Sequence, residues 1–339
     1  MNERINMSDK YQPPFHMTEK ITNLIVEIGE HVGAITTYDA LQKDPVLRRE
    51  NRIRSIHSSL AIEQNTLSLE QVTDVIAGKR VLAPPQDIHE VKNAYDAYEA
   101  AYRMDPYSVE DLLKIHRVMM EGLVNEAGIF RNGNVGVFDG DRLIHAGTPA
   151  KYVPDLVASL FSWLKESDTH PLVKSSIFHY EFEFIHPFAD GNGRMGRLWQ
   201  SLILAKWNNI FEWIPVETMV HEHQQEYYDA LNRAGQIADA APFVELMLEM
   251  ISTTLAEIKE TQRAHSHNLK DNVGDNVGDN VGDKILTLLK ADPKASAKAM
   301  AVKIGISDRQ VERVIKSLRE EGRLVRHGSA RGGHWEIKF

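Results

Sequence analysis

The chain of 339 residues contains no cysteine. Without thiols it cannot form a disulfide scaffold, a thiolate zinc site, an iron–sulfur cluster or a cysteine nucleophile, and a reducing compartment is its expected location. No stretch of the sequence reaches the roughly 18 consecutive apolar residues that a membrane-spanning helix requires. Residues 1–20 also lack the apolar region of a secretory signal. We therefore expect a cytoplasmic protein without a membrane partner.

Charge is distributed unevenly along the chain, whose net charge is -9. Residues 284–339 carry thirteen Lys and Arg against six Asp and Glu, so this tail has a net charge of +7 and the remainder has -16. Residues 272–283 repeat the tetrapeptide NVGD three times, which gives many turn formers and little apolar surface. Since domains have about 150 residues, we expect two, joined by a flexible linker over residues 266–283.

Most of the acidic part has the three- and four-residue apolar spacing of helices rather than the alternation of strands. The expected helices span Pro45–Gln64, Ser68–Ala77, His89–Met104, Ser108–Glu121, Val153–Glu166, Leu172–His186, Arg194–Trp207, Glu222–Arg233 and Pro242–Thr261. In residues 134–145, apolar residues flank the turn sequence Asp139-Gly140-Asp141, which favours a short β-hairpin over a plain surface turn. The predicted fold class is mainly α, a helical bundle with one small hairpin.

Residues 186–197, with the sequence HPFADGNGRMGR, combine several features of a phosphate site. Pro187 disfavours the α conformation at His186, so a helix should end there and leave the imidazole at the mouth of a loop. Glycines on both sides of Asn192 allow the backbone to turn its N–H groups toward an anion, and the next helix adds its positive end. We therefore expect Gly191, Asn192 and Gly193 to bind phosphate groups.

The charged residues of this stretch indicate a polyphosphate ligand. Arg194 and Arg197 lie three residues apart at the positive end of the next helix, where only an anion with more than one charge would favour two cations. Asp190 can hold the Mg²⁺ that accompanies such a ligand, and His186 can act as a general base. These residues predict phosphoryl or nucleotidyl transfer.

An alternative interpretation involves a metal. His179, Glu183 and His186 share one helix face, as the ligands of a metallohydrolase would. Phenylalanines flank the two upstream residues, however, and favour a role in packing.

Residues 186–197 also resemble the signature of the Fic family of protein adenylyltransferases, HPFx(D/E)GNGRxxR, at every fixed position. The resemblance extends more loosely from about residue 55 to residue 243. It implies transfer of AMP from Mg-ATP to a Ser, Thr or Tyr hydroxyl of a target protein or of the chain itself. By this resemblance His186 deprotonates the hydroxyl, Asp190 holds Mg²⁺, Phe188 anchors the loop, and Arg194 and Arg197 bind the β- and γ-phosphates.

The resemblance bears on three further places in the sequence. A relative that phosphorylates its target has a lysine where this chain has Gly193, so the glycine favours AMP transfer. The hairpin of residues 134–145 resembles the family's flap, which pairs with an extended target segment. Tyr227 and Tyr228 resemble the region that binds adenosine, although two tyrosines on a helix are as often core residues.

Glu63 stands on the apolar face of the helix expected over residues 45–64, three residues after Leu60, where a carboxylate needs a partner. It could instead reach water at a frayed helix end. The segment Ser59 to Glu63 resembles the family's inhibitory motif, in which the glutamate pairs with the second signature arginine, here Arg197. The motif continues with Gly or Asn, whereas this chain has Gln64, which leaves the end of the helix open.

The basic tail resembles a winged helix-turn-helix. Its pattern gives helices over residues 284–290, 296–303 and 308–321, with Ser307 as an N-cap, followed by two alternating segments that suit a β-hairpin wing. The residues expected to contact DNA are Arg309, Gln310, Arg313, Lys316, Arg326 and Arg331. A protein-interaction or dimerisation module with a solvated basic face is the alternative.

We therefore expect four regions: an N-terminal helical region with the inhibitory helix (1–100), a Fic catalytic domain (101–265), the linker (266–283) and the winged helix (284–339). The expected activity is protein adenylyltransfer with Mg²⁺, ATP as co-substrate and a protein target. The alternatives are a DNA-binding regulator that senses nucleotide without turnover, and a protein phosphotransferase. A homodimer is compatible with the sequence.

Overall fold

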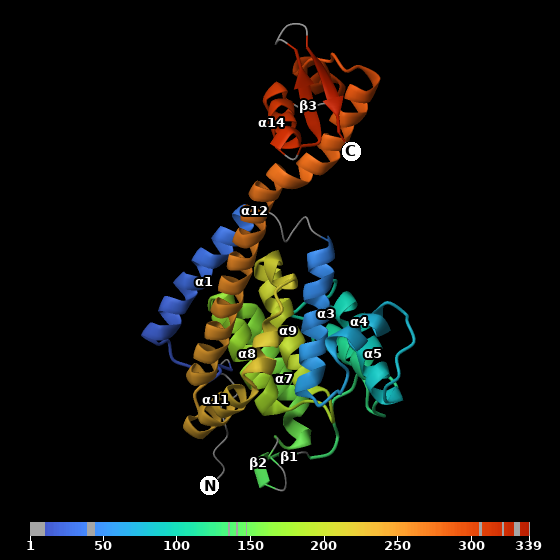
Figure 1. Cartoon of the computed structure of the whole chain (residues 1–339). Helices are drawn as coiled ribbons and strands as arrows, with labels where there is room; N and C mark the ends of the chain where they lie inside the picture. Colours follow the sequence, from blue (N-terminus) through green and yellow to red (C-terminus); the bar gives the residue numbers. More distant parts are fainter. Residues whose placement is uncertain are drawn as a thin grey trace, which may run out of the picture. The chain divides into compact units, whose positions relative to one another are not determined.

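The computed structural model describes the backbone of residues 11–38, 45–134, 136–139, 142–146, 148–304, 307–320, 322–328 and 333–338. The chain divides into two compact units, Met1–Glu260 and Thr261–Phe339, which are described separately. Figure 1 shows that helices dominate both units, as predicted. Within the described ranges, no helix is both long and apolar enough to cross a membrane.

The first unit is a bundle of helices with one hairpin (Figure 1). Its helices are α1 (Glu19–Tyr38), α3 (Pro45–Ile62), α4 (Leu69–Ile76), α5 (Pro85–Ala101), α6 (Val109–Met120), α7 (Val153–Glu166), α8 (Pro171–Ile185), α9 (Asn192–Trp207), α10 (Val216–Glu222), α11 (Gln224–Ile237) and the start of α12 (Ala241–Ala291), with short 3-10 turns η1 (Ala150–Tyr152) and η2 (Asn209–Glu212). The helices expected from the sequence are present. Helix α1 was not predicted, although Ile21, Leu24 and Ile28 have helical spacing and are buried.

Helices α8 and α9 lie side by side at the centre of this unit and are buried on nearly all sides (Figure 1). Helix α8 begins with Pro171 at its first position, where the missing N–H costs nothing, and His170 caps it. Its buried hydroxyls, Ser175 and Ser176, donate to the carbonyl oxygen of Leu172 and so cost little when buried. These two helices form the rigid support from which the loop between them projects.

One hydrophobic core runs from α1 through α12. It includes Ile21, Ile56 and Val91 from the first hundred residues together with Phe178 and Leu198 from the central helices. The structure therefore places the N-terminal helices in the same unit as the signature loop, and no boundary falls near residue 100.

The predicted hairpin is confirmed. Strands β1 (Gly136–Asp139) and β2 (Arg142–Ala146) pair antiparallel, with Val137 opposite His145 and an irregularity between Val137 and Phe138. Residues 140 and 141 of the predicted turn lie outside the described residues.

The backbone of residues 266–283 differs from the expected flexible linker, because it is helical within α12. Extension of an existing helix is far easier than starting one, and helical segments stand on both sides of the repeats.

The second unit has the winged helix arrangement that its sequence predicts. The end of α12 is followed by α13 (Ala297–Ile304), α14 (Asp308–Glu320) and the antiparallel strands β3 (Leu324–His327) and β4 (His334–Ile337). A separate small core holds these elements together; it includes Ile285, Leu289, Met300, Val311 and Leu324.

Candidate active site

The loop between α8 and α9 begins at His186, as predicted. Its N–H still donates to the carbonyl oxygen of Phe182, but its backbone is left-handed, with φ 52° and ψ 63°. Pro187 excludes the right-handed helical conformation here, and the left-handed one turns the chain sharply away from α8. The imidazole is half-buried, and its Nδ1 has no hydrogen-bond partner within the described part of the chain.

Arg131, which the sequence analysis did not single out, fixes this turn. Its guanidinium donates to the carbonyl oxygens of Ile185 (3.2 Å) and His186 (2.6 Å). It also donates to those of Gly133 (2.8 Å) and Thr148 (2.5 Å), which flank the hairpin. Burial lowers the pKa of Arg131 from its ordinary value, but a guanidinium remains charged. One buried cation therefore ties the base of the hairpin to the end of α8.

Asn192 closes the loop from within. Its side-chain oxygen accepts the N–H of Phe188 (2.8 Å) and its amide donates to the carbonyl oxygen of Phe188 (2.9 Å). The side chain is thus occupied, and what Asn192 offers an anion is its backbone N–H at the start of α9. Gly191 has φ +80°, and a Cβ there would lie 2.7 Å from the sulfur of Met120, so only glycine fits.

His116, on α6, supports the same loop and was also missed by the sequence analysis. Its ring stacks on Phe188, with centroids 3.6 Å apart. Its Nδ1 accepts the N–H of Gly128 (2.8 Å), which assigns the proton to Nε2, and Nε2 donates to the carbonyl oxygen of Asp190 (3.0 Å). Burial is the main cause that lowers the pKa of His116 to about 4, so the ring is neutral at physiological pH.

Asp190 is the carboxylate in the loop that can hold a metal ion. Its side chain is 57 % exposed, and Oδ1 accepts the N–H of Gly191 (2.5 Å) and lies 3.3 Å from Arg194. An exposed hard oxygen donor beside a phosphate site fits Mg²⁺, which uses one or two carboxylates and completes its shell with phosphates and water. In the described ranges no three His, Cys, Asp or Glu side chains form a metal-ligating group.

The two arginines of α9 are both buried. Arg194 is 5 % exposed and lies between Asp190 (3.3 Å) and Glu90 on α5 (3.9 Å). Its buried Nε has no partner in the portion of the chain that is described. Glu90 also accepts from the amide of Asn65 (2.9 Å), just after α3. Arg194 is therefore held loosely, with donor capacity left for an anion.

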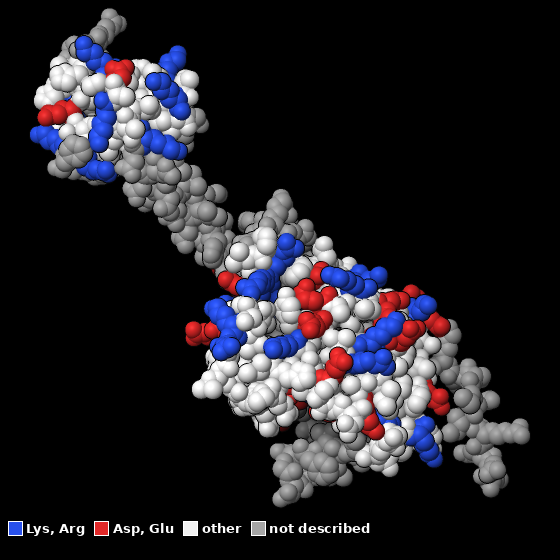
Figure 2. All heavy atoms as spheres, turned by 90° about the vertical axis from the view of Figure 1, so that its right-hand side faces the viewer, with Lys and Arg blue, Asp and Glu red and all other residues white. Residues whose placement is uncertain are grey.

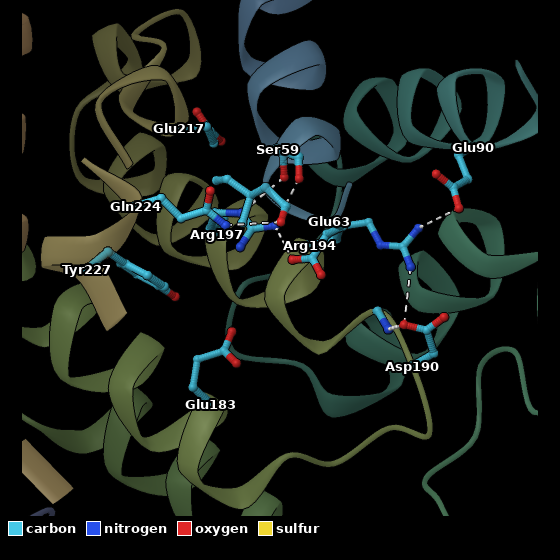
Figure 3. Close-up of polar contacts among 12 residues, drawn as sticks. Ser59, Glu63, Glu90, Glu183, Asp190, Arg194, Arg197, Glu217, Gln224 and Tyr227 are labelled. Carbon is cyan, nitrogen blue, oxygen red and sulfur yellow. Dashed lines mark hydrogen bonds and ion pairs between the residues drawn. The ribbon is translucent and has the colours of Figure 1, made fainter. Parts of the chain in front are cut away.

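Arg197 is held tightly by α3 (Figure 3). It donates to the carboxylate of Glu63 (2.7 Å) and to the hydroxyl (3.2 Å) and carbonyl oxygen (3.0 Å) of Ser59. Burial alone lowers the pKa of Arg197, but Glu63, together with Tyr227 and Glu183, more than offsets this and raises the pKa above its ordinary value. The predicted pairing of Glu63 with Arg197 is present in the structure, and Ser59, the first residue of the same motif, also contacts this arginine.

The end of α3, left open by the sequence, is a complete helix-terminating motif. Gln64 takes the left-handed conformation with φ 68°. The N–H of Asn65 bonds to the carbonyl oxygen of Leu60 (3.1 Å) and that of Gln64 to Ala61 (3.0 Å), the bonding pattern of a Schellman motif. Gln64 thus adopts the conformation that Gly or Asn adopts more easily, and Glu63 stays in register with Arg197.

Helix α3 is also anchored from its other side by Glu217 on α10, which is 3 % exposed. This carboxylate accepts from the hydroxyls of Ser55 (2.9 Å), Tyr98 (3.2 Å) and Ser201 (3.3 Å). A buried carboxylate with three donors is stabilised where it lies, and it links α3, α5 and α9.

The two tyrosines of α11 differ in their surroundings. Tyr227 is 1 % exposed and its hydroxyl bonds to Nε2 of His179 (3.0 Å), so in this conformation it is a core residue. Tyr228 is 41 % exposed and accepts from Gln224 (3.2 Å), which also donates to the carbonyl oxygen of Ile62 at the end of α3 (3.2 Å). Tyr228 is the one of the pair that offers a face to a ligand.

In the second unit, Arg309, Arg313 and Lys316 are exposed on α14 and Arg326 is exposed on β3. Arg326 lies over the ring of Trp335, 4.9 Å from its centroid. Figure 2 shows a face of this unit on which Lys and Arg predominate over Asp and Glu. The side chain of Gln310 and the whole of Arg331 lie outside the described residues.

Comparisons with known proteins agree with this architecture. The profile of the Fic/DOC family matches residues 106–204, and a winged helix-turn-helix DNA-binding profile matches residues 284–325. The crystal structure of a Fic family protein from Desulfovibrio desulfuricans G20 is 43 % identical, with a TM-score of 0.72, over 97 % of this chain and 98 % of that chain. A structure of Fic-1 from Caenorhabditis elegans, at 23 % identity and TM-score 0.59 over 72 % of this chain and 74 % of that chain, shares the fold.

Curated relatives match part of the chain. The protein adenylyltransferase fic-1 of Caenorhabditis elegans is 30 % identical over 251 residues, which are 68 % of this chain and 46 % of that protein. A probable protein adenylyltransferase of Aquifex aeolicus is 29 % identical over 181 residues, 52 % of this chain and 53 % of that protein. The chain thus spans about half the length of the curated relatives it matches.

Proposed function

The chain belongs to the Fic family, and on that premise we propose that it is a protein adenylyltransferase that transfers AMP from ATP to a Ser, Thr or Tyr hydroxyl of a target protein or of itself. One observation carries the proposal. The imidazole of His186 stands at the start of a glycine-flanked turn that leads into α9, whose first turns present two buried arginines. A base is thereby placed next to a site for several negative charges.

The proposed reaction proceeds by in-line displacement. His186 takes the proton of the target hydroxyl as its oxygen bonds to the α-phosphorus, and the bond from that phosphorus to the bridging oxygen breaks, so pyrophosphate leaves with the electron pair. The N–H groups at the start of α9 and the guanidinium of Arg194 bind the phosphates. Asp190 would hold a Mg²⁺, which would neutralise part of the polyphosphate charge.

Gly193 supports AMP transfer over phosphotransfer. A Cβ at this position would overlap the carboxylate of Glu63 and lie 2.9 Å from Nη1 of Arg197. The lysine of the phosphorylating relative therefore has no room here while α3 is in place.

We propose further that Glu63 makes the enzyme autoinhibited. Glu63 and Ser59 occupy three of the five N–H donors of Arg197, and Glu63 also neutralises its charge, so this guanidinium is less able to bind a γ-phosphate. Displacement of α3 would release it. The Schellman end of α3 and the carboxylate of Glu217 support this arrangement, because both hold the helix in register.

Labelled nucleotides test the reaction type. The full chain and its Glu63→Gly variant, from which the inhibitory carboxylate is removed, are incubated with Mg²⁺ and either α- or γ-labelled ATP, with and without cell lysate. We expect label on protein from the α-phosphate alone, and none with His186→Ala. Label from the γ-phosphate would instead identify a phosphotransferase, and label from neither would contradict enzymatic transfer.

The second unit favours DNA as an additional partner. Its match to a DNA-binding winged helix and the exposed cations of α14 support this proposal. A filter-binding assay with genomic fragments tests it, and binding without nucleotide transfer in the assay above would favour a nucleotide-sensing regulator.

A further inference from the structure

The residues His179, Glu183 and His186 form a stripe along α8 that the proposed function uses only in part. They do not form a metal site, since the described ranges contain no metal-ligating group of three such side chains. Two of the three nonetheless have buried polar atoms with no partner among described residues, Oε1 of Glu183 and Nδ1 of His186. Such atoms are costly to bury and indicate an interaction that forms in another state.

The hydrogen-bond partners of His179 indicate which of its ring nitrogens carries the hydrogen. Ser176 donates to a backbone carbonyl oxygen and so accepts from the amide of Gln200 (3.2 Å). The side-chain oxygen of Gln200 is then left to accept, and Nδ1 of His179 donates to it (2.7 Å). In the tautomer that carries its hydrogen on Nδ1, Nε2 accepts from the hydroxyl of Tyr227 (3.0 Å). Both ring nitrogens of His179 are thus engaged by Gln200 and Tyr227.

Oε1 of Glu183 has no hydrogen-bond partner among the described residues. Its side chain is 14 % exposed, and Oε1 lies 3.7 Å from Nε2 of His179, beyond hydrogen-bond distance. Figure 3 shows the carboxylate directed toward the space between Tyr227 and Arg197. A Cβ on residue 196 would lie 2.8 Å from Oε1, so Gly196 makes room for this side chain. Burial raises the pKa of Glu183, but neighbouring His179, His186 and Arg197 hold it below its ordinary value.

Nδ1 of His186 and Oε1 of Glu183 both lack a hydrogen-bond partner among the described residues, and the first can donate to the second. A histidine that accepts a proton through Nε2 carries its own hydrogen on Nδ1, and a second group normally holds that hydrogen. The two residues are three apart in sequence at the end of α8, where His186 is the left-handed C-cap, and the charge of His186 is among those that lower the pKa of Glu183, so the two side chains are neighbours.

We propose that Glu183 is the positioning residue of His186: its carboxylate accepts the Nδ1 hydrogen and thereby leaves Nε2 unprotonated and directed at the target hydroxyl. This inference rests on the proposed adenylyl transfer. When the hydroxyl proton moves to Nε2, the imidazolium that forms lies beside a carboxylate that stabilises it. Glu183 itself exchanges no proton.

Other charged and titratable groups face this pair. Arg197 on α9, Tyr227 on α11 and His179 on α8 face Glu183, and Arg131 donates to the backbone oxygen of His186. Burial keeps the pKa of Tyr227 well above its ordinary value, and the two arginines remain charged. His179 has both ring nitrogens engaged.

The test compares Glu183→Gln, which keeps the shape without the charge, with Glu181→Gln as the matched control. Glu181 is buried on the same helix, but it pairs with the hydroxyl of Tyr11 (2.5 Å). An NMR titration without nucleotide follows the ring signal of His186, identified by its loss in His186→Ala. Because a nearby carboxylate favours imidazolium, we expect Glu183→Gln to lower the pKa of His186 by about one unit and Glu181→Gln to leave it unchanged.

Kinetics in a Glu63→Gly background give the second readout. We expect Glu183→Gln to lower kcat for AMP transfer roughly 10- to 100-fold, to move the acidic limb of the pH profile downward, and to leave KM for ATP within about twofold. An unchanged pKa of His186, or a raised KM for ATP with an unchanged pH profile, overturns the proposal. If no variant transfers AMP, the proposed function fails, while the titration still decides whether Glu183 acts on His186.

Discussion

Removal of the Glu63 carboxylate should convert the chain from a poorly active to an active adenylyltransferase. The structure gives the reason: Glu63 binds Arg197 at 2.7 Å, and Ser59 occupies two more of its donor contacts. Glu63→Gly deletes the charged contact and leaves both Ser59 contacts in place. Arg197 then needs only to break neutral hydrogen bonds in order to reach a γ-phosphate.

The free energy that the ion pair between Glu63 and Arg197 contributes depends on how exposed the two side chains are. A fully buried pair that loses one member costs about 3–5 kcal/mol, whereas a surface pair is worth about 0–1 kcal/mol. Arg197 is 3 % exposed but Glu63 is 33 % exposed, so this pair lies between the two limits. We take about 1–3 kcal/mol, which corresponds to an increase of about 5- to 150-fold in the fraction of chains that have Arg197 available.

A graded series sharpens the test. With α-labelled ATP and Mg²⁺, initial rates of self-modification should rise in the order wild type, Ser59→Ala, Glu63→Gln and Glu63→Gly. Ser59→Ala removes one weak contact at 3.2 Å, and Glu63→Gln keeps an acceptor but loses its charge. Equal rates in wild type and Glu63→Gly, with folding verified by thermal unfolding, would refute the reasoning.

Three further predictions concern stability and binding. Gln64→Gly should raise the Tm of the first unit by about 2–4 °C, because glycine relieves about 1 kcal/mol of left-handed backbone strain. Calorimetry measures the Tm, and an unchanged or lower value would contradict this prediction. The pKa of His116 is about 4, below the ordinary 6.5, so between these pH values the unfolded chain binds a proton that the folded chain excludes. The free energy of unfolding should therefore fall by about 3 kcal/mol as the pH is lowered from 6.5 to 4. Urea midpoints measure this loss, and it should be absent in His116→Gln. Arg313→Ala should weaken DNA binding about equally across sequences and reduce the salt dependence of the binding constant by about one ion, and an unchanged slope would exclude a phosphate contact there.

Local patterns in the sequence predicted much of the helical framework. Apolar spacing located α7 to within a residue at both ends, and the turn sequence located the hairpin, because both depend on neighbours a few residues apart. The twelve-residue signature located the loop between α8 and α9 for the same reason. The sequence also indicated that Glu63 needed a partner.

The supports of the site could not be predicted in this way, because they join residues far apart in the chain. Arg131 reaches residues 185 and 186, and His116 reaches Asp190, and neither belongs to a recurrent local pattern. Glu217 accepts hydrogen bonds from hydroxyls on three other helices, so its part in joining these helices can be recognised only in the assembled core. Tertiary packing likewise buries Tyr227 and leaves Tyr228 partly exposed, a difference that the sequence does not indicate.

The turn after α3 contacts more of the candidate site than Arg197 alone. Glu63 holds Arg197, and two residues later Asn65 binds Glu90, which in turn lies beside Arg194. Both guanidinium groups are thus tethered to one short piece of backbone. A binding partner that pulled this piece outward would release both arginines in a single event, so activity plotted against partner concentration should rise in one saturating step without an intermediate plateau.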